Sequence, residues 1–175
     1  MVIIGIDPGK NGGLAALDGE QATAVSMPDT CSGIRDAILS LKGDGPAMAF
    51  MEKVNSQPGE GVSSAATFGE NRGRLEMALC CLNIRTEMVS PQRWQRPLSV
   101  PTLDPVGKRP EKQADETPEA FKDRKKAWAR QRGQNRTAKK NALKVIASQR
   151  FPTLTVTLKT CDALLIADYG CTVVK

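Results

Sequence analysis

The sequence predicts an α/β fold in which helices flank a mixed central sheet. Two apolar runs within residues 2–17, followed by the turn signal Asp18-Gly19, indicate an antiparallel start. Two later segments that predict strands, the apolar run at 47–51 and residues 84–89, alternate with segments of helical periodicity. That alternation is typical of parallel strands joined by helices, so the later part of the sheet is expected to be parallel.

The first strand is predicted from the run Met1-Val-Ile-Ile-Gly-Ile-Asp-Pro-Gly9. A continuous apolar stretch that breaks at Pro-Gly is typical of a central strand buried on both faces. The run ends in a carboxylate, Asp7, and burying a charge is costly unless something pairs with it. A bound metal ion is one such partner, and a strand end that simply meets solvent is the alternative.

Two more strands and a helix follow. Residues 12–17 predict the second strand, Asp18-Gly19 the hairpin turn, and the alternating residues 21–27 the third strand. Either Asp29 or Thr30 is suited to cap the helix. The apolar residues of this helix, at helical spacing, are Ile34, Ile38, Leu39 and Leu41.

A second buried strand is predicted at residues 47–51, and it also ends in a carboxylate, Glu52. Next along the chain we expect a loop at 55–62, a helix from Ser63 or Ser64 to Leu82, a strand at 84–89 and a short helix after Ser90-Pro91. Gly69 and Gly73, four residues apart on the longer helix, are expected to permit close packing. Trp94, on the shorter helix, is expected in the core.

The second half of the chain predicts an insertion. Residues 97–118 contain five prolines and no apolar periodicity, so we expect an extended excursion. A basic helix follows, and Gly-Gln-Asn at 133–135 is expected to break it before a further helix at about 137–149. We therefore predict a single domain over residues 1–175 with a Pro-rich and basic insertion at about 97–137.

A third acid begins the last predicted element, an apolar helix over residues 162–169 that we expect Gly170 to end. If the strands ending in Asp7 and Glu52 are parallel neighbours, this helix can bring Asp162 to the same place. Three carboxylates that converge in a low-dielectric place repel one another and therefore imply bound cations. An acid in the first turn of a helix is also favourable by itself, so that alternative stays open.

Composition excludes several kinds of chemistry in this 175-residue chain. It has no histidine, which excludes Ser-His-Asp catalysis and imidazole metal ligands. A metal site must then use oxygen ligands, which favour Mg²⁺ or Mn²⁺ over zinc. The five cysteines are odd in number and lack CxxC spacing, so reduced thiols are expected. Because no run predicts a membrane span or a signal peptide, we expect an intracellular, cytoplasmic protein.

Charge is divided unevenly along the chain. Residues 1–89 hold 7 Lys+Arg against 11 Asp+Glu, a net charge of −4, whereas residues 90–175 hold 18 against 8, a net charge of +10. Most of the excess lies in 121–150, where 11 basic residues accompany one acid, Asp123. This division suits a polyanion, above all nucleic acid, held by one half and processed with metal by the other. A solvated helix surface is the alternative.

Five motifs stand in order along the chain. They are Val2-Ile-Ile-Gly-Ile-Asp-Pro-Gly9, Met51-Glu-Lys-Val54, Thr67-Phe-Gly-Glu-Asn-Arg-Gly73, Val89-Ser-Pro-Gln-Arg-Trp94 and Asp162-Ala-Leu-Leu-Ile-Ala167. Their order and spacing, over residues 1–94 and 138–170, resemble those of RuvC-type Holliday junction resolvases, especially the phage branch. The first motif is moderately specific by itself, and the specificity of the match lies in all five together.

The resemblance implies an RNase H-like fold, a homodimer, and Mg²⁺-dependent nicking of paired strands at a four-way DNA junction that leaves 5′-phosphates. Mn²⁺ is expected to substitute for Mg²⁺. The family's catalytic, metal-binding acids correspond to Asp7, Glu52 and Asp162. The residues that we predict to contact DNA are Arg72, Arg74, Lys125, Lys126, Arg130, Lys139, Lys140 and Lys159.

The chain departs from the family's pattern in three ways. The family often has a further acid one helical turn before Asp162, where this chain has Lys159, so either three acids suffice or Lys159 contacts phosphate. Asp168 is a poor substitute, because it lies about 120° around the helix. Some relatives carry a junction-opening phenylalanine where this chain has Asn55. The insertion at 97–137 is a further difference, which we expect to extend the DNA footprint.

Three other functions remain in competition. A branched-DNA nuclease acting on flaps and forks is a variant of the resolvase. A junction-binding module would bind tightly and cut poorly. An ATP-binding enzyme of the actin and sugar-kinase type also begins with Gly-x-Asp-x-Gly, but it predicts a second lobe and a second phosphate loop, and the sequence shows no second such motif.

Overall fold

The computed structural model describes residues 1–53, 61–101 and 103–174. Asn55 and most of the loop predicted at 55–62 lie outside the described residues. Within the described residues, no helix is both long enough and apolar enough to cross a membrane.

The chain forms two compact units. The first comprises Met1–Leu98 and Lys144–Lys175, and the second comprises Ser99–Leu143. All five strands belong to the first unit. We predicted a single domain with an insertion at about 97–137. Whether the two units form one domain stays a prediction.

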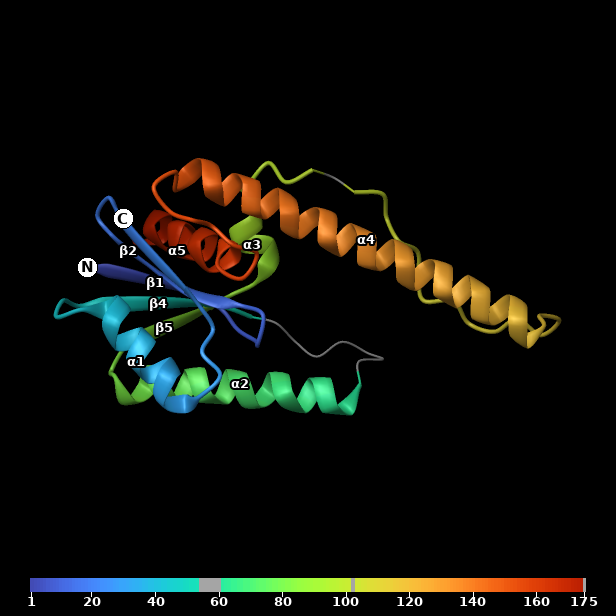
Figure 1. The fold of residues 1–175 in the computed structure, drawn as a ribbon, viewed down its shortest axis with the longest axis horizontal. Coiled ribbons are helices and arrows are strands. Elements are labelled where there is room, and N and C mark those ends of the chain that lie inside the picture. The colour runs from blue at the N-terminus through green and yellow to red at the C-terminus, as the bar shows by residue number, and fades with distance from the viewer. Residues whose placement is uncertain (54–60, 102, 175) are drawn as a thin grey trace. The chain divides into compact units, whose positions relative to one another are not determined.

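The first unit is built on a five-stranded mixed sheet (Figure 1). Its strands are β1 (Val2–Asp7), β2 (Gly13–Asp18), β3 (Gln21–Ser26), β4 (Ala47–Glu52) and β5 (Arg85–Val89). In the order β3-β2-β1-β4-β5, the first three strands of the chain pair antiparallel, whereas β4 pairs parallel with both β1 and β5. The predicted mixed α/β sheet with an antiparallel start is confirmed.

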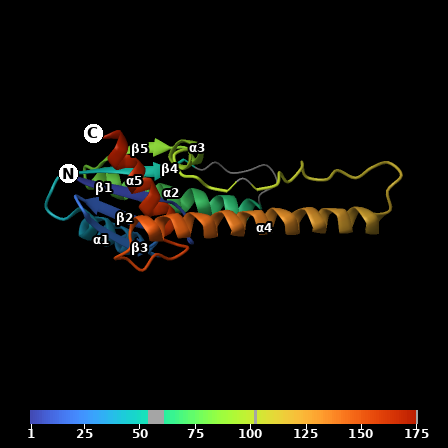
Figure 2. The ribbon, with the colours of Figure 1, turned by 90° about the horizontal axis from the view of Figure 1, so that it is seen from above.

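Helices cover both faces of this sheet. The helices of the chain are α1 (Cys31–Lys42), α2 (Val62–Cys81), α3 (Pro91–Gln95), α4 (Pro118–Arg150) and α5 (Cys161–Val173). In the first unit, α1 and α2 lie on one face and α5 lies on the other (Figure 1). Seen from above, α5 crosses the strands (Figure 2) and packs on β1, β2 and β4. Thr30 caps α1, as predicted, by accepting a hydrogen bond from the Gly33 backbone N–H at 3.0 Å.

Strand periodicity assigns alternate residues of β1 to the two faces. Ile4 and Ile6 are fully buried and belong to the main apolar cluster, together with Ile34 of α1. Gly5 and Asp7 point the opposite way, toward α5. The face of the sheet that carries Asp7 is therefore the face that α5 covers.

The close approach of α5 depends on glycines. A Cβ at Gly5 would lie 2.1 Å from the carbonyl oxygen of Ala163, a distance that no side chain tolerates. We predicted that Gly170 ends α5, and this is wrong, because α5 continues to Val173. A Cβ at Gly170 would lie 2.5 Å from Cδ2 of Phe50, so this glycine serves helix–sheet packing instead.

α4 is one continuous helix of 33 residues. The predicted break at 133–135 and the separate helix at 137–149 are therefore wrong. A glycine inside a helix costs only about 1 kcal/mol relative to alanine, and good helix formers on both sides outweigh that cost. A Cβ at Gly133 would meet nothing within 4 Å, so no close contact requires a turn there. α4 ends directly before Phe151-Pro152, as predicted.

The remaining local predictions have mixed outcomes. Residues 103–117 contain no helix or strand, as expected. Trp94 is completely buried, as expected. Within the described part of this chain a Cβ at Gly69 or Gly73 would meet nothing within 4 Å, so close packing at these glycines stays a prediction for a dimer interface.

Gly170 lies in close contact with the sheet and Gly73 lies in open space, so an added methyl group should have opposite effects at these two positions. Gly170→Ala should lower the free energy of unfolding by about 1–3 kcal/mol, because the methyl group overpacks the α5–sheet contact. Gly73→Ala, in open space on α2, should raise it by about 0.5–1 kcal/mol through the helix propensity of alanine. Denaturant unfolding measures both variants, and a stable Gly170→Ala protein would contradict the close approach of α5.

Candidate functional site

The carboxyl ends of β1 and β4 meet at one edge of the sheet. The parallel register pairs Gly5 with Phe50. Asp7 and Glu52 stand two residues further along each strand, so they share both the edge and the face with that pair. Gly5 and Phe50 both lie against α5. The side chains of Asp7 and Glu52 therefore leave the sheet on the side of α5.

Asp162 comes to the same edge from the first turn of α5. Gly13 of β2 pairs with Asp7 in the sheet. A Cβ at Gly13 would lie 2.6 Å from the carbonyl oxygen of Lys159, in the turn that leads into α5. The beginning of α5 is thereby held over the end of β1.

The three acids are nearly excluded from solvent. Asp7 and Glu52 are each 9% exposed, and Asp162 is 8% exposed. Among the described residues, the buried polar or charged side chains are these three and that of Thr160, which directly precedes α5. Carboxylates are rarely buried to this degree unless they are paired. The structure thus gathers the three predicted acids into one corner of the first unit, and their catalytic role stays a prediction.

Two solved structures of Thermus thermophilus RuvC have a similar fold. T. thermophilus RuvC in complex with Holliday junction substrate is 14% identical, with a TM-score of 0.57, and the match covers 99% of this chain and 96% of that chain. A further Thermus thermophilus RuvC structure matches with a TM-score of 0.52 at the same identity and coverage. The fold is RNase H-like. No protein-family model and no curated protein matches the sequence.

A hydrogen bond that sequence reasoning missed orients one acid of this RNase H-like fold. The indole Nε1–H of Trp94 donates to Oε1 of Glu52 at 2.9 Å, and the bond is buried. The Lys53 backbone N–H continues the strand pairing by donating to the carbonyl oxygen of Val89 at 2.7 Å. A buried tryptophan usually finds an acceptor for its N–H, which is the one signal that could have suggested this pairing.

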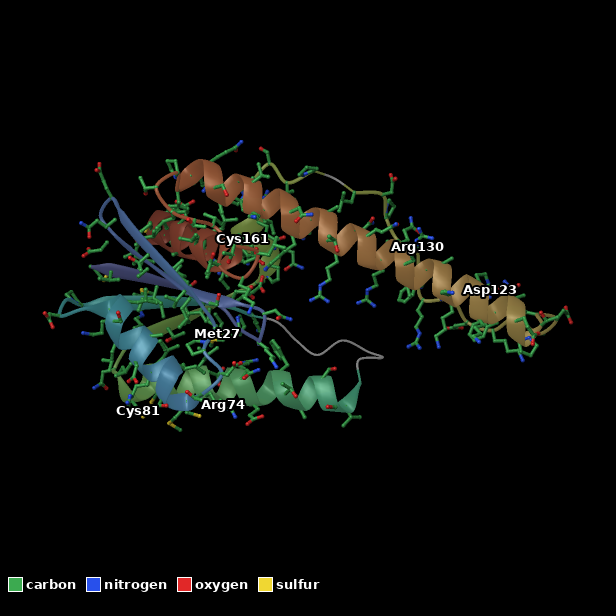
Figure 3. The ribbon with its side chains drawn as sticks, viewed as in Figure 1. Met27, Arg74, Cys81, Asp123, Arg130 and Cys161 are labelled. Carbon is green, nitrogen blue, oxygen red and sulfur yellow. The ribbon has the colours of Figure 1, made fainter. Side chains whose placement is uncertain are left out.

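The turn before α5 is tied together by threonines. The Thr157 backbone N–H donates to Oγ1 of Thr160 at 3.0 Å, and the Thr160 backbone N–H donates to the Thr157 carbonyl oxygen at 3.2 Å. Figure 3 labels Cys161 at the start of α5, where its Sγ contacts Oδ1 of Asp162 at 3.3 Å. These bonds close the turn from which α5 begins, directly before Asp162.

The donor set of the acid corner is chemically suited to a hard divalent cation. Three carboxylates and no histidine provide only the oxygen ligands that Mg²⁺ and Mn²⁺ prefer. Within residues 1–53, 61–101 and 103–174, however, no group of three or more acidic or cysteine side chains is spaced to hold one ion. Shared ligation by all three acids would require them to approach one another more closely.

Lys159 and Asp168, the two residues at the departures from the family's pattern, have different surroundings. The side chain of Lys159 is exposed, in the turn beside the acid corner. Asp168 forms an ion pair with Arg150, which joins the end of α4 to α5. Asp168 therefore has a structural partner, whereas Lys159 offers an exposed cation next to the three acids.

Arg72 and Arg74, predicted to contact phosphates, are paired along α2. Arg72 forms an ion pair with Glu76 at 2.8 Å, one turn later, and Arg74 forms one with Glu70, one turn earlier. Arg74, labelled in Figure 3, also donates to the Asp29 carbonyl oxygen at 3.4 Å. α2 covers the face of the sheet opposite the one that α5 covers.

The other predicted DNA contacts lie on α4, in the second unit. Lys125, Lys126, Arg130 and Lys139 are exposed, and Lys140 is half-buried. These residues form a cationic surface on α4.

The Trp94–Glu52 hydrogen bond predicts an energetic coupling. Trp94→Phe should lower the free energy of unfolding, and about 1.5–3 kcal/mol of the loss should come from the bond to a charged acceptor. In a Glu52→Ala background the same substitution should remove only packing energy. Denaturant unfolding of the four proteins gives the coupling as the difference between these two losses. Additive losses would show that the bond contributes nothing.

Proposed function

We propose that this protein is a metal-dependent, structure-specific endonuclease that resolves four-way DNA junctions by paired nicking and leaves 5′-phosphates. The observation that carries the proposal is the gathering of Asp7, Glu52 and Asp162 at one edge of an RNase H-like sheet. The similarity of the fold to that of RuvC, which is known in complex with a Holliday junction substrate, supports the same chemistry. The excess of basic residues after residue 90 suits a polyanionic substrate.

In this proposal the three carboxylates hold Mg²⁺, for which Mn²⁺ can substitute. A divalent cation so bound lowers the pKa of a water molecule and stabilises the leaving oxygen of a phosphodiester. Trp94 keeps the Glu52 carboxylate in one orientation. The turn before α5 does the same for Asp162, and Lys159 is available to contact a phosphate beside the cut. The chain has no histidine, and none would be needed as a base because the cation would activate the water.

The proposal includes a homodimer, because paired nicking requires two sites on two strands of matching polarity. Each copy would supply one set of Asp7, Glu52 and Asp162. A phage source and a place in the host cytoplasm, where branched genomes are resolved, belong to the same proposal.

A second candidate function is a junction-binding protein that cuts poorly. Two observations favour it. The three acids, with all other described acidic and cysteine residues, form no group spaced for a single ion. In addition, an exposed lysine, Lys159, stands where the resemblance expects a further acid. This candidate shares the DNA substrate and differs in the rate of cleavage.

A nicking assay with Asp7→Asn tests the active site. On a labelled four-way junction in Mg²⁺, the variant should lose more activity than the roughly 10–100-fold that removal of an outer-shell partner causes, because a proposed metal ligand is removed. Junction binding in Ca²⁺ should persist. Asp18→Asn, an exposed aspartate at the end of β2, is the matched control and should nick normally. Full activity in Asp7→Asn would remove Asp7 from the mechanism.

The same assay separates the candidate functions when a linear duplex and a 5′-flap are included, each in Mg²⁺, Mn²⁺ and EDTA. Symmetric metal-dependent nicks on the junction alone would establish a resolvase. Equal cutting of flap and junction would indicate a branched-DNA nuclease. Tight junction binding without cutting in either metal would favour the junction-binding protein.

A further inference from the structure

One face of α4 in the second unit is covered by the chain's own proline-rich segment. Nη2 of Arg124 donates to the Glu111 carbonyl oxygen at 2.9 Å. Two further bonds complete the set: Nε1 of Trp128 donates to the Gly107 carbonyl oxygen at 2.7 Å, and Nδ2 of Asn135 donates to the Asp104 carbonyl oxygen at 2.7 Å. The donors ascend along the helix as the acceptors descend, so the segment runs antiparallel to α4. We call Arg124, Trp128 and Asn135 the covered face.

Further contacts hold the covered face. Arg124 also donates to both carboxylate oxygens of Glu116, at 2.9 and 2.7 Å, and this pairing holds the pKa of the Glu116 carboxyl below its ordinary value. The guanidinium carbon of Arg132 lies 5.4 Å from the centre of the Trp128 ring. Trp128 is therefore engaged within the unit by its N–H and its ring.

The opposite side of α4 carries a stripe of cations and small residues. Lys122, Lys126, Ala129, Gly133 and Arg136 follow one another at intervals of four, three, four and three, which places them along one side of a helix. All five are exposed. At 100° per residue, this basic stripe lies roughly half a turn away from the covered face.

The middle of the basic stripe carries small side chains, and a cationic residue lies on each side of it. Its middle positions are Ala129 and Gly133, and a Cβ at Gly133 would meet nothing within 4 Å. Lys125 and Arg130 flank the stripe on either side, by the same helical geometry. Figure 3 labels Arg130 on α4, about two turns beyond Asp123. The stripe therefore offers a shallow floor of small residues, with cations at both of its ends and one flanking cation on each side.

These features point to duplex DNA as the occupant. From Lys122 to Arg136 the stripe is about 21 Å long, and a duplex presents a phosphate charge every 1.7 Å or so of its axis. The major groove admits one α-helix between two phosphate walls. Alanine and glycine carry no side-chain donors or acceptors for base edges, so contact at the floor is sequence-blind and the flanking cations supply the affinity.

We propose that the basic stripe of α4 lies in the major groove of a duplex arm and grips it without regard to sequence, while the covered face keeps the proline-rich segment away from the DNA. The proposal deepens the proposed function, because it names the surface that holds the substrate. The test measures binding to a linear duplex in EDTA, where no cleavage is needed. It therefore remains decisive for the stripe even if the protein binds DNA without cutting it.

The test compares two identical substitutions in the full-length chain. Ala129→Glu places an acid on the stripe, and Ala127→Glu places the same acid on an exposed position about 160° away. Both keep helix propensity and change net charge equally. Ala129→Glu should weaken binding to a linear duplex about tenfold or more, and Ala127→Glu less than about threefold. Equal weakening by the two variants would overturn the stripe as the binding surface.

Two further measurements separate groove insertion from general attraction to polyanions. Gly133→Leu adds bulk without charge, so it should weaken duplex binding severalfold if the stripe enters a groove. A duplex whose pyrimidines carry bulky groups on C5, which project into the major groove, should bind more weakly than the plain duplex. Unchanged affinity in both measurements, or equal competition by heparin and duplex at equal charge, would overturn the major-groove placement. Circular dichroism of each variant confirms that α4 remains helical.

Discussion

The close approach of α5 to the sheet is the constraint on which the first unit depends. The backbone of α5 lies so near β1 that Gly5 has no room for a side chain, and Gly170 allows the other end of the helix to settle on Phe50. This packing brings Asp162, in the first turn, to the edge where Asp7 ends its strand. Without the glycines, the helix would stand farther off and the acids would separate.

Polar groups around this corner form hydrogen bonds beside its buried acids. Glu52 receives a hydrogen bond from a fully buried tryptophan, and the turn that precedes Asp162 is closed by Thr157 and Thr160. A buried polar group is tolerated when it is hydrogen-bonded. The arrangement therefore combines low solvent exposure with a defined orientation of these acids.

Glycine shows why local signals mislead in this chain. Gly133 and Gly170 both resemble helix breakers in the sequence, yet each lies inside a helix. At Gly133 the surroundings are open, so helix propensity on either side prevails. At Gly170 the neighbouring strand requires the missing side chain. The meaning of a glycine depends on what lies beside it in space, and spacing along the chain does not carry that information.

The sequence by itself predicted the antiparallel start, a helix capped at Asp29 or Thr30, and three acids as candidates for one site, because periodicity, turn chemistry and charge at strand ends are local properties. The five ordered motifs also predicted the RNase H-like fold. Only the tertiary structure decided that Trp94 is the partner of Glu52, that Asp168 is paired with Arg150, and which side of α4 is covered. Those pairings join residues 18 to 42 positions apart, and such contacts depend on packing that no local pattern specifies.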